Sequence, residues 1–265
     1  MMEKMVFGRY IPGDSFVHRL DPRSKLMFVF IFIAAVFLAN STASYALLLA
    51  FTLLAILASK VRIGFLIGGL KPVMFLIAFT FLLHIFFTKE GDLLFELGFL
   101  KIYEEGLRQG IYISVRFLVL VLMTSLLTLT TSPISITDGL EVLLNPLKKV
   151  KFPVHELALM MSISLRFIPT LMDETDKILK AQLARGSDIS SGTMKERVQA
   201  VVPLLVPLFV SAFKRAEDLA IAMEVRGYRG GEGRTRYRQL KWDWRDTTAL
   251  LILLAVIVAL WFLRG

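Results

Sequence analysis

Two arginines in a repeated sequence context are the side chains of this chain best suited to holding a partner. Arg185 lies in Ala-Gln-Leu-Ala-Arg-Gly (181–186), and Arg226 lies in Ala-Met-Glu-Val-Arg-Gly (222–227). Each motif closes a segment with helical apolar spacing, and a glycine just beyond such a segment usually ends the helix, because it adopts the left-handed conformation without a Cβ penalty. A guanidinium at a helix C-terminus is favoured by the helix dipole and can form bidentate hydrogen bonds. The spacing therefore predicts two helix ends that each present a directional cation.

A simpler interpretation is that each motif is an ordinary helix C-cap that happens to contain arginine. Taken singly, either motif is explained in this way. The repetition favours a function, because a cluster of acidic and basic residues precedes both motifs, at 173–177 and at 214–218. We interpret the two motifs as one device used twice.

The composition indicates a membrane protein. Of the 265 residues 55% are hydrophobic, and long runs contain no charge. The net charge of +9 comes from basic residues beside the apolar runs, so the positive-inside rule explains it better than nucleic-acid binding. The absence of cysteine excludes disulfides and thiolate catalysis. The polar tail before Leu26 contains Asp14, Asp21 and two prolines and is not typical of a signal peptide.

The first apolar run predicts two short membrane spans. Residues 26–59 carry no charge, and one helix of that length would measure about 50 Å, longer than a hydrocarbon core of about 30 Å. The polar group at 40–44 therefore marks a tight turn between two spans. Asp21 and Pro22 suit a helix start, as N-cap and first helical residue, and we expect Arg23 and Lys25 to reach toward the headgroups.

Further spans are predicted at 73–88, 110–131 and 247–263. The loop at 89–108 has five acidic and three basic residues and is expected outside the cell. Basic residues near the ends of the spans place the N-terminus in the cytoplasm and the C-terminus outside. Arg116, the only charge within the hydrophobic length of a span, is interpreted as a snorkelling or structural arginine.

The stretch 137–246 combines apolar runs with 18 basic and 14 acidic residues. It predicts a short helix over 136–150 broken at Asn145-Pro146, a helix beginning at Pro153, and a third helix carrying 198–213. We expect Pro203 and Pro207 to interrupt the third helix. The two longer helices are predicted to lie at the cytoplasmic face of the membrane with their apolar surfaces toward it; tilted spans are the alternative.

Local pairing and packing signals are weaker. Ion pairs four residues apart are expected between Asp173 and Lys177 and between Asp176 and Lys180. A Ser/Gly loop is expected at 187–192, and a flexible basic, glycine-rich segment at 227–238. The spacings Gly64-x3-Gly68 and Gly106-x3-Gly110 are candidates for close helix packing.

Motifs that carry catalysis are missing from the sequence. There is no Gly-x4-Gly-Lys-Ser/Thr for a nucleotide and no Gly-x-Ser-x-Gly for a hydrolase. His18, His84 and His155 are scattered, so no metal or other cofactor is predicted. The chain is interpreted as a non-catalytic membrane scaffold that depends on an external energy source.

Several segments together resemble one transporter family. They are Gly8-Arg-Tyr-Ile-Pro-Gly-Asp-Ser, the stretch His18–Leu26, the two arginine motifs, and the stretch Met223–Tyr237. These residues resemble the transmembrane T component of energy-coupling factor (ECF) transporters. They resemble the shared type of T component more closely than the types dedicated to cobalt or biotin. The resemblance implies an all-α, L-shaped polytopic protein of the prokaryotic cell membrane, with about five transmembrane helices and a cytoplasmic coupling-helix domain. The corresponding domains are 1–136, 137–245 and 246–265.

The resemblance also implies the partners and the residues that would meet them. A pair of ATPase subunits, expected to be a heterodimer, would hydrolyse ATP and grip the two motifs. The coupling residues carried over are Ala184, Arg185, Gly186, Val225, Arg226 and Gly227. Interchangeable S components, which bind vitamins or other micronutrients, would sit on the apolar surface of the coupling helices. The platform residues are Met161, Leu165, Ile168, Leu205 and Phe209.

Two alternative functions stay open from the residues alone. A self-contained secondary transporter needs a site near the membrane midplane, and no paired broken helices or buried carboxylate indicate one. An intramembrane enzyme needs clustered catalytic groups, and the sequence shows none. Co-purification of two ATPase subunits separates the scaffold from both alternatives.

Overall fold

The computed structural model describes residues 10–97, 100–186, 193–230 and 239–264. It contains two compact units. The larger unit holds residues 7–143 and 240–265, and the smaller unit holds residues 144–239. The predicted loop at 187–192, the part of the basic segment at 231–238, and residues 1–9 lie outside the described residues. The three-part division at 136 and 245 stays a prediction.

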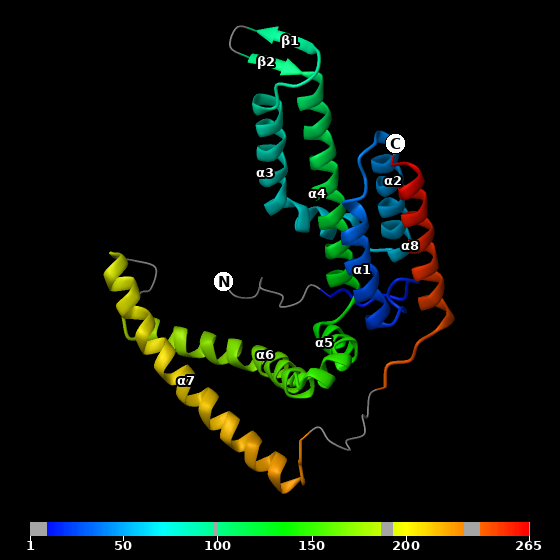
Figure 1. Cartoon of the computed structure of the whole chain (residues 1–265). Coiled ribbons are helices and arrows are strands. Elements are labelled where there is room, and N and C mark those ends of the chain that lie inside the picture. The colour runs from blue at the N-terminus through cyan, green and yellow to red at the C-terminus, as the bar shows by residue number, and fades with distance from the viewer. Residues whose placement is uncertain (1–9, 98–99, 187–192, 231–238, 265) are drawn as a thin grey trace. The chain divides into compact units, whose positions relative to one another are not determined.

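The larger unit is built from helices and one β-hairpin (Figure 1). Its elements are α1 (Pro22–Val36), α2 (Thr42–Ser59), α3 (Ile63–Phe87), β1 (Leu93–Leu97), β2 (Leu100–Tyr103), α4 (Glu104–Thr130), α5 (Pro133–Leu143) and α8 (Trp244–Phe262). The predicted break in the first apolar run is confirmed, because α1 ends at Val36 and Ser41 caps α2 by accepting a hydrogen bond from the Ser44 N–H. Asp21 is the N-cap of α1, as predicted, and Pro22 follows it.

The core of the larger unit lies among α1, α2, α4 and α8. Phe32, Leu48, Met123 and Leu260, one from each helix, are fully buried there. Since α3 contributes only Leu66 to the buried residues and packs mainly on α4, the α3–α4 pair extends beyond this core (Figure 1).

Glycines allow α3 and α4 to approach closely. A Cβ built at Gly106 would lie 2.9 Å from the His84 carbonyl oxygen, and one at Gly110 would lie 3.0 Å from the Phe81 ring. This confirms the predicted packing role of the Gly106-x3-Gly110 pair. A Cβ at Gly64 would meet nothing within 4 Å, so the same prediction was wrong for that residue.

Two predictions about α3 and the loop that follows it were wrong. The helix begins at Ile63, ten residues before the predicted span at 73–88, and continues through Lys71 and Pro72; Figure 1 shows that it bends, as proline inside a helix explains. The predicted external loop at 89–108 contains the antiparallel hairpin of β1 and β2 and the first turn of α4. Apolar residues such as Leu93 and Leu94 supply β propensity there.

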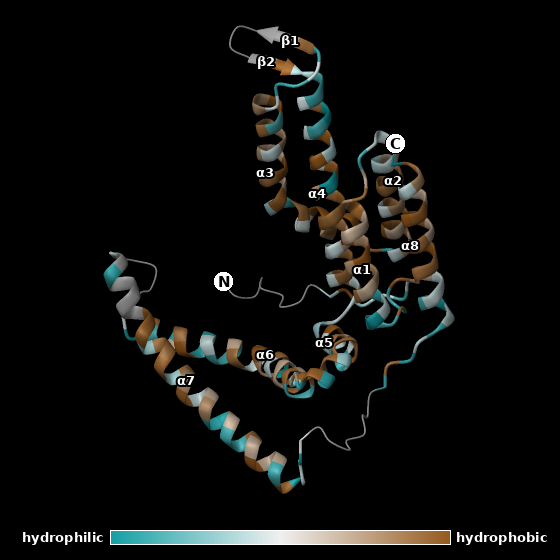
Figure 2. Ribbon diagram, viewed as in Figure 1, coloured by the Kyte–Doolittle hydropathy of each residue, from teal (hydrophilic) through white to brown (hydrophobic). Residues whose placement is uncertain are grey.

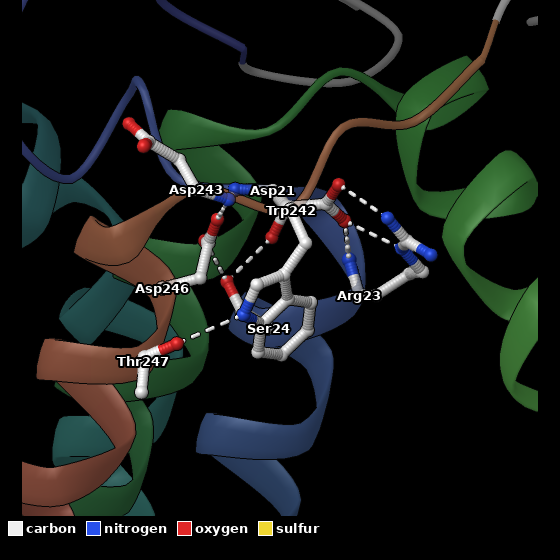
Figure 3. A network of polar contacts seen from close by, with 7 residues as sticks. All are labelled: Asp21, Arg23, Ser24, Trp242, Asp243, Asp246 and Thr247. Carbon is white, nitrogen blue, oxygen red and sulfur yellow. Dashed lines mark hydrogen bonds and ion pairs between the residues drawn. The ribbon is translucent and has the colours of Figure 1, made fainter.

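A buried carboxylate joins α1 to α8 (Figure 3). Asp246, 1% exposed, accepts hydrogen bonds from the backbone N–H groups of Asp21 and Asp243, each at 2.8 Å, and from the Ser24 hydroxyl. Asp243 and Asp246 also form the capping box of α8. One side chain therefore completes the starts of two helices that are more than 200 residues apart in the sequence.

The N-terminal tail is tied to the end of α4. The Ile11 N–H donates to the Leu129 carbonyl at 2.9 Å. Lys25 is 6% exposed, and its Nζ donates to the carbonyl oxygens of His18 and Thr130 and to the Thr131 hydroxyl. The prediction that Lys25 reaches toward headgroups was therefore wrong, because three buried acceptors hold its ammonium inside the protein.

Arg23 and Arg116 are also held by the protein. Arg23 donates to both carboxylate oxygens of Asp21 at 3.0 Å and lies over the Trp242 ring, so it does not extend freely. Arg116 donates to the Tyr45 hydroxyl at 2.6 Å and to the Ala39 carbonyl oxygen. Its interpretation as a structural arginine is confirmed.

The smaller unit consists of a 3₁₀ turn and two long helices. They are η2 (Asn145–Val150), α6 (Val154–Ala184) and α7 (Met194–Val225). The predicted break at Asn145-Pro146 is confirmed, because α5 ends at Leu143 and η2 follows. The predicted interruption of the third helix was wrong: α7 runs unbroken through Pro203 and Pro207.

Five helices of the described chain are long and apolar enough to cross a membrane, namely α2, α3, α4, α6 and α8. The described residues form no sheet beyond one hairpin, and together these observations confirm the all-α polytopic membrane class. The number agrees with the prediction of about five spans, but the members differ. α1 has 15 residues, about 22 Å, whereas α6 qualifies by length and composition.

Candidate functional site: the ends of α6 and α7

Arg185 is the C-cap residue of α6. Its backbone N–H donates to the carbonyl oxygens of Ala181 and Gln182, and the Gly186 N–H donates to the Leu183 carbonyl at 3.0 Å. Gly186 has a φ of +82°, the left-handed value that glycine adopts without strain. The predicted helix end is thereby confirmed, and both Ala184 and Arg185 are exposed beside it.

Arg226 has the corresponding position at the end of α7. The Gly227 N–H donates to the Glu224 carbonyl at 2.8 Å, and the Tyr228 N–H donates to the Met223 carbonyl at 2.9 Å. With Gly227 at a φ of +73°, these two bonds make a Schellman motif. Val225 and Arg226 are exposed, so the second guanidinium also stands at the very end of a rigid helix.

The two helices cross at a polar contact. Glu174 of α6 accepts a hydrogen bond from the Ser211 hydroxyl at 2.9 Å and forms an ion pair with Arg215, both on α7. The predicted pairs Asp173–Lys177 and Asp176–Lys180 are not among the ion pairs of the described residues. Along the helix axis, the rise from Glu174 to Arg185 is about 16 Å, and the rise to Arg226 is about 22 Å from Ser211 and about 16 Å from Arg215.

The predicted platform residues lie on α6 and α7 and differ in exposure. Met161, Leu205 and Phe209 are exposed, Phe209 by 61%, whereas Leu165 and Ile168 are half-buried. On α6, Met161, Leu165 and Ile168 share one side by helical spacing, and the residues that contact α7 are on the other side. Figure 2 shows brown apolar stretches on both helices and more teal, hydrophilic residues toward the Arg226 end of α7.

The structure adds residues that no sequence motif marks. In the sequence, Glu174 and Arg215 are only members of mixed-charge clusters. Arg166 and Arg229 belong to neither cluster, yet both line a pocket together with Arg226. The sequence does contain a feature that marks Arg166 as a candidate functional residue. It is the only charged residue between Glu156 and Asp173. Among the described residues, no group of three His, Asp or Glu side chains is placed to hold a metal ion.

Known proteins similar to the chain cover nearly all of it. The family model CbiQ, described as "Cobalt transport protein", matches residues 13–237. The energy-coupling factor transporter transmembrane protein EcfT of Bacillus subtilis (strain 168) is 63% identical over 265 residues, which is the whole of both chains. The EcfT proteins of Listeria innocua and Macrococcus caseolyticus are 61% and 56% identical, with at least 98% of each chain covered.

The chain belongs to the EcfT family. It is accordingly the transmembrane component of an energy-coupling factor transporter in a bacterial membrane. Family membership favours a transport function over the intramembrane enzyme that the residues alone left open. For an EcfT protein, two exposed arginines at equivalent helix ends are the natural candidates for the coupling that the name describes.

Proposed function

We propose that this EcfT-family chain is the non-catalytic scaffold of an ATP-driven importer of vitamins or other micronutrients. Two ATPase subunits, forming a heterodimer, hydrolyse ATP, and interchangeable S components bind the cargo. The chain transmits movement from the ATPases to the S component. The observation that carries this proposal is the identical C-cap placement of Arg185 and Arg226 at the ends of two helices that cross within one unit.

The arginines act as the grips of the ATPases. A C-cap guanidinium projects beyond its helix, and it can donate two parallel hydrogen bonds to a carboxylate or to carbonyl oxygens of a partner. Flanking Ala184, Gly186, Val225 and Gly227 offer little bulk beside the tip. Movement of an ATPase subunit is therefore transmitted through the arginine into the axis of α6 or α7.

The apolar residues of the coupling helices hold the S component. Exposed apolar surface of the extent found on α6 and α7 is uncommon on monomers and marks an interaction site. In this arrangement α6 and α7 lie at the cytoplasmic face of the membrane, the N-terminus is in the cytoplasm, and the C-terminus is outside. Met161, Leu205 and Phe209 are the exposed members of the platform.

Co-purification with charged platform variants tests the division of labour. Met161→Glu and Leu205→Glu should release the S component from the membrane complex while both ATPase subunits remain bound. Lys177→Glu, which places a glutamate at an exposed residue on the other side of α6, is the matched control. Retention of the S component by both platform variants would show that it binds elsewhere, and failure of any ATPase subunit to co-purify with the wild-type chain would contradict the scaffold function.

A further inference from the structure

A pocket with an unusual charge lies between α6 and the end of α7. Its volume is about 580 Å³, and its lining includes Arg166 from α6, Arg226 from the second motif, and Arg229 just beyond it. Apolar side chains, among them Ile163 and Met223, form another part of the wall. The described lining includes no carboxylate, so three cationic residues surround one cavity without a compensating acid.

The three guanidinium groups have no partners within the described part of the chain. Three other arginines of this protein are held by side chains: Arg23 by Asp21, Arg116 by Tyr45, and Arg215 by Glu174. By contrast, the side chains of Arg166, Arg226 and Arg229 form no hydrogen bond or ion pair with any described residue. Their donors are therefore available, and their mutual repulsion favours an anionic occupant.

We propose that this pocket receives an acidic side chain of one ATPase subunit, and that Arg166 and Arg229 grip it together with Arg226. This rests on the coupling function proposed above, which assigns a role to Arg226 but none to the other two arginines. A protein segment fits the lining better than a small anion, because protein interfaces combine an apolar centre with arginine contacts, whereas a free anion needs only donors.

The composite pocket has a mechanical consequence. Arg166 lies in the first half of α6, and Arg226 and Arg229 belong to the end of α7 and the residues after it. A carboxylate bound by all three joins both coupling helices to the same point of one ATPase subunit. Movement of that subunit then moves both helices together. The second motif therefore connects the ATPase subunit to α6 and α7, and not to the end of α7 alone.

Affinity measurements with the full transporter test this assignment. The affinity of the purified ATPase heterodimer is measured for the full chain in lipid nanodiscs, comparing wild type with Arg166→Gln, Arg229→Gln and Arg226→Ala. Lys214→Gln removes the same charge from an exposed residue of α7 outside the pocket lining and is the control. Loss of one charge-assisted hydrogen bond should weaken binding about ten- to a hundredfold in Arg166→Gln and Arg229→Gln, and Arg166→Lys should recover part of the loss.

The outcomes separate this inference from the coupling function itself. If Arg226→Ala weakens binding while Arg166→Gln and Arg229→Gln match Lys214→Gln, the composite pocket is disproved and the coupling function stands. If Arg226→Ala itself binds like wild type, the coupling function fails. Inorganic phosphate is compared with chloride at equal ionic strength; specific competition by phosphate would identify a small-anion site and overturn the assignment to a protein carboxylate.

Discussion

A C-cap arginine joins helix structure and partner binding in one residue. The backbone N–H of Arg185 closes the last turn of α6, so the residue cannot move without the helix, and its side chain is free to reach a partner. Arg226 has the same relation to α7, with Gly227 and Tyr228 completing the cap. If flexible residues separated the arginine from the end of the helix, this rigid connection would be lost.

Asp246 is the acceptor for three hydrogen-bond donors of the larger unit. Asp246→Ala would leave the backbone N–H groups of Asp21 and Asp243 and the Ser24 hydroxyl without their acceptor. Because each buried unsatisfied donor costs about 1–3 kcal/mol, we expect the free energy of unfolding to fall by about 3 kcal/mol or more. Thermal unfolding in detergent measures this change.

The control for that prediction is the neighbouring aspartate. Asp243→Ala removes an N-cap whose side chain is half-exposed and accepts from the Trp244 N–H; such a loss costs about 1 kcal/mol. Equal destabilisation by the two variants would contradict the role given to the buried carboxylate.

His18 gives the tail a dependence on pH. Its Nε2 donates to the Ile11 carbonyl at 3.0 Å, and its Nδ1 lies 2.7 Å from the Ser15 hydroxyl. Burial lowers the pKa of His18 below its usual 6.5, so the folded tail favours the neutral ring. The contribution of neutral His18 to the free energy of unfolding is complete above pH 6.5. It is lost as the pH falls from there through the lower pKa of the folded state.

Thermal unfolding between pH 7.5 and 5 checks this sign. The midpoint of the wild type should fall more over this range than that of His18→Gln, which cannot gain the proton. A parallel decline of the two proteins would assign the pH dependence to other groups.

At the scale of elements, local signals predicted the helix ends but not the contacts between helices. The caps at Asp21 and Ser41 and the two Arg-Gly ends depend on neighbouring residues, so the sequence contains them. α7 stays continuous because Pro203 and Pro207 are four residues apart, and the missing N–H groups lie on one side of the helix. Burial of Lys25 and Asp246 depends on segments over 100 residues away, and no local pattern indicates it.

The contact of Glu174 with Ser211 and Arg215 sets how α6 and α7 cross. Glu174→Ala removes the acceptor for both α7 side chains, so amide hydrogen exchange at 171–178 and 208–216 should become severalfold faster. The exchanged pair Glu174→Arg with Arg215→Glu should restore part of the protection. Ser164→Ala, which alters an exposed hydroxyl of α6, is the control; the same rates in Glu174→Ala and this control would contradict a fixing role.

At the scale of the whole molecule, the proposed orientation assigns a membrane side to each exposed loop. The natural chain has no cysteine, so single cysteines report their side directly. In sealed cells, an impermeant thiol reagent should label Glu90→Cys and Arg264→Cys but not Asp218→Cys, all at exposed positions. Labelling of Asp218→Cys from outside would overturn the assignment of the coupling helices to the cytoplasm.

In the whole transporter, we propose that Arg185 and Arg226 carry the coupling. Loss of one partner from a desolvated charged pair costs about 2–5 kcal/mol at interfaces, so each single alanine variant should weaken the grip or uncouple ATP hydrolysis from uptake. The two effects need not be equal, because a heterodimeric ATPase offers two different surfaces. Lysine at either position should restore only part of the function, since it lacks the planar fork of donors.

Cargo uptake by the double variant tests this claim most directly. Proteoliposomes contain the Arg185→Ala, Arg226→Ala chain, both ATPase subunits and one S component. ATP is supplied on the side of the membrane where the ATPases lie, and uptake of the vitamin that the S component binds is measured. We expect uptake at the background level, with membrane insertion and binding of the S component retained. Uptake near the wild-type rate would disprove the coupling role and would leave the two motifs as ordinary helix caps.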